Sequence, residues 1–270
     1  MINRTLLFTT ISLLFLSSCI KYSPYDIRLE EHEHDINQKN INRILQIAEK
    51  DTLTIALTGD AQRFYDETLL LVEAINKDRS IDFMLFSGDM TDFGLTLEYQ
   101  AINSIFETLN VPYVSVIGNH DYNYNGQEIF AQMFGPLNFS FDLQGFRFVF
   151  CNTNSREVGW DGHVPNIPWI EEQLADTANY YGAIVVNHVP PDNIDFDPDL
   201  EDDFTDALHF AGKTMMQLNG HNHDFGAGYP YYGDIHYINS ASPQKKMFIK
   251  IKIWKNSSPQ NSHSFEIIKF

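Results

Sequence analysis

Five short loops of this sequence carry side chains of the types that bind metal ions or move protons. They contain carboxylates, imidazoles and carboxamides, and they occupy residues 58–62, 87–92, 118–121, 187–188 and 219–223. A mixture of these ligand types suits Mn, Fe, Zn or Ni better than an all-oxygen calcium site. The residue types therefore predict a metal centre assembled from distant parts of the chain.

Each loop taken alone is a weak signal. A Gly-Asp turn such as Gly59-Asp60 occurs by chance in many proteins, and a lone histidine such as His188 is more often a hydrogen-bonded core residue. The order of the loops is more specific, because each follows a short apolar run. Open α/β sheets build their sites at the carboxyl ends of strands. We therefore expect the five loops to converge, with glycines allowing the sharp turns.

The segments between the loops alternate between strand and helix patterns. Strands are predicted at residues 53–57, 83–86, 113–117, 183–186 and 215–218, a hairpin at 139–150, and an antiparallel pair at 247–254 and 264–270. Helices are predicted near 66–76, at 95–109 and at 170–178, where apolar residues recur at spacings of three and four. Alternating strands and helices predict a largely parallel sheet covered by helices.

Taken in chain order, the five loops resemble the calcineurin-like metallophosphoesterase pattern D-x-H, G-D-x-x-D, G-N-H-[ED], H, G-H-x-H. The match runs from Asp60 to His223. The resemblance implies an α/β fold, a four-layer αββα sandwich in which two mixed β-sheets pack face to face between helices. It also implies a centre of two divalent metal ions at one edge of the sandwich.

The resemblance assigns a ligand set to each ion. One set is Asp60, Gln62, Asp89 and His223, and the other is Asp89, Asn119, His188 and His221, so that Asp89 bridges the two ions. Position 62 departs from the pattern, which has histidine there. A carboxamide oxygen still binds metal, but it is a weaker donor than imidazole to zinc-like ions. We therefore expect the ion at Gln62 to bind more weakly than its partner and to favour Mn or Mg.

A dinuclear centre of this kind hydrolyses a phosphomonoester or phosphodiester by attack of a metal-bridging hydroxide. By resemblance, His120 lies outside the ligand sets and donates a proton to the leaving alkoxide. Asp121 is expected to orient the imidazole of His120, with a simple turn residue as the alternative. Asp92 is expected to bond backbone amides in its own loop.

The sequence leaves two alternative hypotheses about function open. The first is a non-catalytic, exported metal-binding lipoprotein, with Gln62 marking the loss of activity, although a retained His120 argues against it. The second concerns the ester, because monoesters, cyclic nucleotides and phospholipid headgroups all suit such a centre. The loop aromatics Tyr122, Tyr124 and Trp160 are predicted either to stack on a base or sugar or to pack locally.

Charge narrows the class of partner. The chain has 18 Lys and Arg against 36 Asp and Glu, which gives a net charge of −18 and a pI near 4.7. Such a field repels long polyanions, so binding to nucleic-acid polymers is not expected. A small phosphate-ester substrate is less affected, because bound divalent cations dominate the field inside the site.

The first residues have the pattern of a targeting signal. Arg4 precedes an apolar run over residues 6–16, which is shorter than the roughly 20 residues that span a bilayer. Residues 16–19, ending in Cys19, resemble the lipobox of bacterial lipoproteins. The resemblance implies that residues 1–18 are removed and that Cys19 anchors the protein to a membrane of the bacterial cell envelope, facing the periplasm or the surface. An ordinary secretion signal is the alternative.

The remainder of the chain divides into two expected segments. Residues 19–50 read as a polar tether and an N-terminal helix with Ile41 and Ile44 on one face, and residues 51–270 as the phosphoesterase domain. The acidic and histidine-rich run at 30–35 either binds metal or forms a solvated face. Once Cys19 is acylated, Cys151 has no cysteine partner within the chain, so no intramolecular disulfide is expected.

Overall fold

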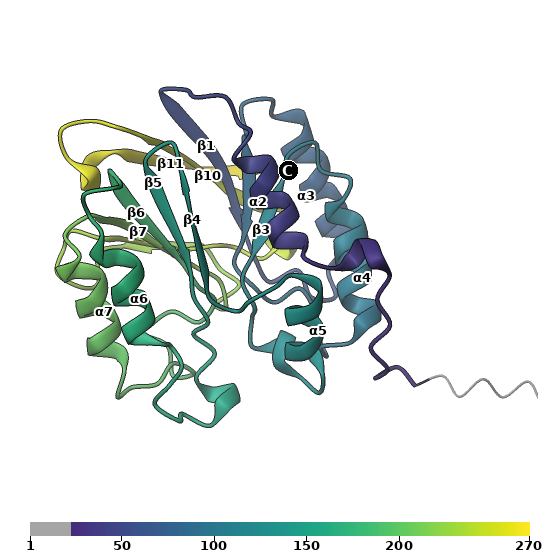
Figure 1. The fold of residues 1–270 in the computed structure, drawn as a ribbon. Helices are drawn as coiled ribbons and strands as arrows, with labels where there is room; N and C mark the ends of the chain where they lie inside the picture. Colours follow the sequence, from purple (N-terminus) through teal and green to yellow (C-terminus); the bar gives the residue numbers. More distant parts are fainter. Residues whose placement is uncertain (1–22) are drawn as a thin grey trace, which may run out of the picture.

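Two β-sheets lie face to face in the computed structural model, which describes residues 23–270 (Figure 1). The first sheet has the strand order β11-β10-β1-β2-β3, and the second has the order β4-β5-β6-β7-β9-β8. Helices α3 and α4 lie outside the first sheet, and α6 and α7 lie outside the second. The predicted arrangement of two mixed sheets flanked by helices is confirmed.

The first sheet is parallel on one side and antiparallel on the other. Its parallel strands are β1 (Thr52–Thr58), β2 (Phe83–Phe86) and β3 (Tyr113–Ser115), joined by α3 (Tyr65–Lys77) and α4 (Thr96–Phe106). Its antiparallel strands are β10 (Met247–Trp254) and β11 (His263–Lys269). Strands buried on both faces read as continuous apolar runs, which is why β1 and β2 were predictable.

The second sheet begins with the hairpin of β4 (Phe139–Leu143) and β5 (Phe146–Phe150). Strands β6 (Gly182–Val186), β7 (Thr214–Asn219) and β9 (His236–Asn239) follow in parallel, and β8 (Gly226–Gly228) closes the edge antiparallel to β9. The covering helices are α6 (Ile167–Ala175) and α7 (Glu201–Phe210). Helix α5 (Gly126–Met133) follows the third loop. The sequence patterns did not predict α5, α7, β8 or β9.

The main core lies between the two sheets. Alternate strand positions point into it and are almost fully buried, among them Ile55, Leu57, Phe148, Ile249 and Ile251. The intervening positions point outward onto the helices, as Met84 and Phe86 do toward α3 and α4. Each such large side chain contributes about 1.5–3 kcal/mol on burial. The strands are thereby fixed in the register that brings their carboxyl ends together.

The segment expected to be a tether is partly docked on the domain. Helix α2 (Ile36–Ile44) packs against β3, and the amide of Asn37 bonds both backbone groups of Ser115, accepting from its N–H and donating to its carbonyl at 2.9 Å each. Ile27 and Leu29 pack against the core under α3 and α4. The boundary at residue 51 therefore does not separate two bodies.

The run at residues 30–35 is also docked. The carboxylate of Glu33 is buried and accepts hydrogen bonds from the backbone of Glu30 and the amide of Gln100, while His34 lies 3.1 Å from the carbonyl oxygen of Gln132. Among the residues that the structure describes, this run gathers no group of three metal-ligating side chains. These contacts give it a structural role.

The predicted signal segment and Cys19 lie outside the described residues. Within residues 23–270, no helix combines the length and the apolar character needed to cross a bilayer.

Candidate metal centre

The five loops meet at one end of the sandwich. They follow β1, β2, β3, β6 and β7, whose carboxyl ends point the same way within each sheet. Gly118 permits the closest approach between two of them, because a Cβ atom there would lie 2.1 Å from Oδ1 of Asp89. The sequence therefore brings the predicted side chains to one place through strand order and glycine turns.

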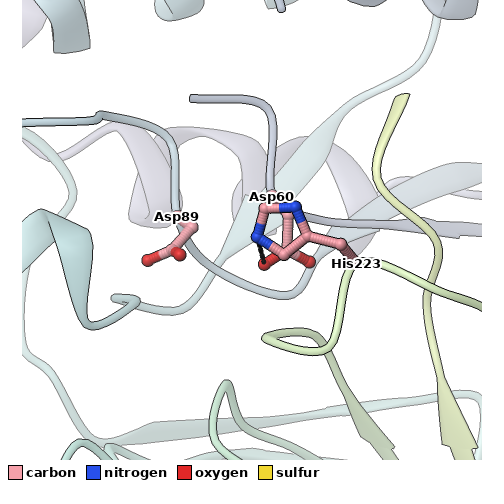
Figure 2. A group of neighbouring side chains, drawn as sticks. All are labelled: Asp60, Asp89 and His223. Carbon is pink, nitrogen blue, oxygen red and sulfur yellow. Dashed lines mark ion pairs between the residues drawn. The ribbon is translucent and has the colours of Figure 1, made fainter. Parts of the chain in front are cut away.

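Asp60, Asp89 and His223 form the first group of ligand types (Figure 2). One ligand atom from each lies within 4.8 Å of the others, and Nε2 of His223 is 3.6 Å from Oδ1 of Asp60. Both carboxylates are buried. Gln62 joins this group, but its Nε2 donates to Oδ2 of Asp89 at 3.0 Å. To offer its oxygen to a cation, the Gln62 amide must turn over and give up that hydrogen bond.

A second group shares Asp89 with the first. Oδ1 of Asn119 lies 2.9 Å from Nε2 of His188 and 2.9 Å from Nδ1 of His221. The same His188 nitrogen is 3.4 Å from Oδ1 of Asp89. The structure thus assembles both predicted ligand sets side by side, with Asp89 between them.

The backbone of these loops is unusual. Positive φ angles occur at Asp60 (57°), Gln62 (39°), Asp89 (61°), His221 (75°) and His223 (59°). Few non-glycine residues adopt this left-handed region, and each instance costs of order 1–3 kcal/mol. Five instances among the predicted ligands show that the surrounding fold holds these side chains in place against local strain.

The electrostatics of the buried carboxylates fit a bound cation. Burial raises the pKa of Asp60 well above its ordinary value, and the charge of Asp89 raises it further while His188 opposes. At Asp89, burial acts in the same direction but is outweighed by His188, which lowers the pKa. The positive charge of one imidazole, that of His188, therefore offsets the negative charge of only one of the two neighbouring buried carboxylates. Because a divalent ion would compensate both, the donor set and its charge suit such an ion.

His120 lies at the open side of this centre, with its side chain 38% exposed. Its ring Nδ1 is 3.1 Å from the carbonyl oxygen of Asp92 and 3.6 Å from Oδ1 of the same residue. Its backbone N–H donates to Oδ1 of Asp89. The imidazole is thus next to the predicted ligands and reachable from solvent.

The expected roles of Asp121 and Asp92 were wrong. The Asp121 carboxylate accepts from the backbone N–H groups of Asp89, Met90, Thr91 and Gly118 and from the Thr91 hydroxyl, so it holds the Asp89 loop. Asp92 instead lies beside His120 and pairs with Arg63 at 2.8 Å. Within the short 3-10 turn His120–Tyr122, adjacent side chains make different contacts: His120 lies against Asp92, and Asp121 lies against the loop of Asp89.

Sequence reasoning missed Asp195 and Arg156. Oδ2 of Asp195 lies 3.4 Å from Nε2 of His221, and Arg156 donates to the Asp195 carboxylate at 3.0 Å. Residues 187–200 contain several aspartates, and nothing in the pattern distinguishes Asp195 from the others. Its contact with His221 is set by tertiary structure.

The loop aromatics differ in their surroundings. The Tyr122 hydroxyl accepts from Asn152, and Tyr124 packs on Tyr25 with ring centroids 4.6 Å apart. These contacts match the local-packing reading for both residues. Trp160 is 47% exposed.

The sequence is similar to a known protein family and to two named relatives. Residues 53–225 match the family described as calcineurin-like phosphoesterase. A probable cyclic nucleotide phosphodiesterase of Synechococcus is 25% identical over 157 residues, 54% of this chain and 60% of that protein. The glycerophosphodiester phosphodiesterase GpdQ of Enterobacter lignolyticus is 27% identical over 160 residues, 53% of this chain and 56% of that protein. The matched segment thus spans somewhat more than half of either relative.

Solved structures share the fold. A dimetal phosphatase from Danio rerio superposes with a TM-score of 0.63 over 80% of this chain and 99% of that one, at 14% identity. A purple acid phosphatase from yellow lupin gives a TM-score of 0.61 over 82% of this chain and 54% of that one, at 15% identity. At these identities the likeness extends to the fold alone.

Proposed function

The chain belongs to the calcineurin-like phosphoesterase family, and on that premise we propose that it hydrolyses a phosphate ester with two divalent metal ions. The observation that carries the proposal is the position of Asp89, which lies between two groups of ligand types. His120 lies on the solvent-exposed side of the same centre. A site that only stored metal would have no use for an accessible imidazole beside its ligands.

The ligand assignment follows the two groups. Asp60, Gln62, Asp89 and His223 would hold one ion, and Asp89, Asn119, His188 and His221 the other. Bound together, two such ions would supply a hydroxide nucleophile at neutral pH and neutralise charge on the phosphate oxygens. Mixed nitrogen and oxygen donors suit Mn, Fe, Zn or Ni.

The residues around the metal positions divide the remaining work. His120 would give a proton to the leaving alkoxide, since its ring is exposed toward incoming substrate. Asp92 holds the ring through its carbonyl oxygen and carboxylate, and Arg63 holds Asp92. The Asp121 carboxylate holds the loop of Asp89 in place by accepting hydrogen bonds from its backbone N–H groups. A small phosphate ester is the proposed substrate, and the phosphodiesterase names of the two relatives favour a diester.

The proposed location is the bacterial cell envelope. The lipobox-like residues before Cys19 support removal of residues 1–18 and acylation of Cys19, which would anchor the protein to a membrane. No nucleic-acid polymer is proposed as a partner, because the net charge is −18.

The decisive experiment combines elemental analysis with paired assays. The purified protein is tested on chromogenic phosphomonoester and phosphodiester substrates, with and without added manganese. We expect bound transition metal and manganese-stimulated hydrolysis, with the diester preferred. Bound metal without activity toward either ester would favour the storage reading instead.

A further inference from the structure

Four exposed apolar side chains lie on neighbouring segments of the chain, one of which follows Asp92 beside His120. They are Tyr25 (44% exposed), Phe93 (56%), Leu97 (55%) and Tyr124 (73%), here termed the apolar rim. Exposed apolar residues are common when scattered, but a contiguous group marks an interaction site. The rim draws its members from three separate segments of the chain, so it is a product of the fold.

Direct contacts join these segments. The ring of Tyr25 packs on the ring of Tyr124 at an interplanar angle of 36°, and the Tyr25 carbonyl oxygen accepts from Asn125 at 3.0 Å. The hydroxyl of Thr96 donates to the carbonyl oxygen of Asp26 at 3.2 Å. Asn123 donates to the carbonyl oxygen of Asp92 at 3.3 Å, which ties the loop of Phe93 to the loop of Tyr124. These contacts hold the three segments that carry the rim next to one another.

The chain's first described residues lie close in sequence to the proposed lipid anchor. Only residues 20–22 separate Cys19 from Ser23, and four Cα steps reach at most about 14 Å. Tyr25, two residues further on, is itself part of the rim. In Figure 1 the chain enters beside α4 and α5, on the side opposite α7. An acyl group on Cys19 would thus hold the rim within a short distance of the bilayer surface.

We propose that the apolar rim is the membrane-facing surface of the protein and rests in the headgroup region of the bilayer. The inference depends on the lipid anchor proposed for Cys19 and is independent of the phosphoesterase activity. Tyrosine and phenylalanine suit this zone because their rings are largely apolar, and the tyrosine hydroxyl remains in contact with water. The net charge of −18 gives no attraction to anionic lipids, so zwitterionic lipid suffices as the partner.

This orientation also places the metal centre near the membrane. The carbonyl oxygen of Asp92, the residue before Phe93, contacts the ring of His120. The membrane-facing surface and the proposed active site are thus neighbours in the fold.

The test uses the acylated full chain in phosphatidylcholine vesicles that contain a spin-labelled lipid. Tryptophan is introduced singly as Phe93→Trp, Tyr124→Trp and, as the matched control, Phe210→Trp on α7. Phe210 is 73% exposed, the same as Tyr124. After subtraction of the wild-type fluorescence, we expect at least about twofold stronger quenching at positions 93 and 124 than at position 210.

Equal or stronger quenching at position 210 would overturn the proposal, and so would a mass spectrum showing Cys19 unmodified in membrane-extracted protein. Adding Phe93→Ser and Leu97→Ser to the Tyr124→Trp chain should reduce quenching at position 124 while the anchor still retains the protein on vesicles. Hydrolysis of a soluble chromogenic diester by the same samples reports separately on the proposed enzyme activity.

Discussion

The carboxylate of Asp195 and the ring of His221 meet at 3.4 Å, on the opposite ring nitrogen from the one that faces Asn119. Arg156 holds the carboxylate in place, and the Asp195 backbone N–H donates to Asn193 at 2.9 Å. A carboxylate beside one imidazole nitrogen favours the proton there and leaves the other nitrogen free to bind metal. Asp195 is thus a positioning residue for His221.

Replacing Asp195 with asparagine should weaken metal binding about 10-fold or more, because His221 loses the partner that fixes its tautomer. Calorimetric titration of metal-free protein with manganese measures the change. The matched control is Asp199→Asn, an exposed carboxylate four residues along the same loop. Unchanged affinity in Asp195→Asn would remove the positioning role.

His120→Ala should lower the turnover rate by at least about 100-fold, because the leaving group loses its proton donor. Metal content should stay at the wild-type level, since His120 lies outside the ligand groups. The exposed His163 serves as the control, and His163→Ala should leave turnover unchanged. Loss of metal from His120→Ala would place this imidazole in the ligand shell instead.

Gln62→His should raise the affinity of the weaker metal position about 10-fold for zinc-like ions, because imidazole is the stronger donor. In the wild type the Gln62 amide must also give up its hydrogen bond to Asp89. Titration of both proteins with manganese and with zinc measures the two positions. Two equally tight positions in the wild type would contradict the expectation.

Asp121→Ala should destabilise the fold by roughly 3 kcal/mol, because several donors of the Asp89 loop lose their buried acceptor. Urea unfolding of the metal-free protein measures this cost. Asp121→Asn keeps one acceptor oxygen, so its free energy of unfolding should lie between those of the wild type and Asp121→Ala. A change below about 0.5 kcal/mol in Asp121→Ala would show that water replaces the carboxylate.

The Asp78–Lys250 pair should contribute to stability in a defined pH range. Burial alone would raise the pKa of Asp78, but Lys250 at 2.7 Å and Ser80 outweigh it and lower the value from 3.8 to about 2. A lowered carboxyl pKa stabilises the fold above 3.8, and that contribution is lost as the pH falls toward about 2. After allowance for solvent screening, we expect a loss of about 1 kcal/mol.

Urea unfolding of wild type and Asp78→Asn between pH 2 and pH 5 tests this pair. The variant should be less stable near pH 5 and similar to wild type near pH 2. The exposed Asp51 gives the control, Asp51→Asn. A constant difference between wild type and Asp78→Asn across the range would disprove the electrostatic origin.

The strands of the fold were predictable where burial on both faces produced an unbroken apolar run, as in β2 (Phe83–Phe86). Helix α6 was predicted about one turn too late, because Asn166 caps it and Pro168 lies in its first turn. Helix α7 was missed because its first turn is entirely acidic and only part of one face is apolar. Strand β8 has three residues, two of them glycine, and carries no periodic signal.

At the site, residue types and order predicted which side chains converge. The exchange between Asp92 and Asp121 was not predictable, because the direction of each side chain depends on loop backbone angles and not on spacing. The contact of Asp195 with His221 joins two loops through tertiary structure. Local pattern thus identified the candidate ligands, while the residues that support them required the folded structure.

The side chain of Asn37 makes the backbone hydrogen bonds that a neighbouring strand would make with Ser115. Strand β3 lies at the edge of its sheet, and the Asn37 amide satisfies both backbone groups of Ser115 that would otherwise face outward. An open edge is a template for pairing with another chain. Proteolysis between α2 and β1, followed by loss of α2, would therefore do more than release the protein from its membrane, because the freed molecule would expose the edge of β3 to pairing with another chain.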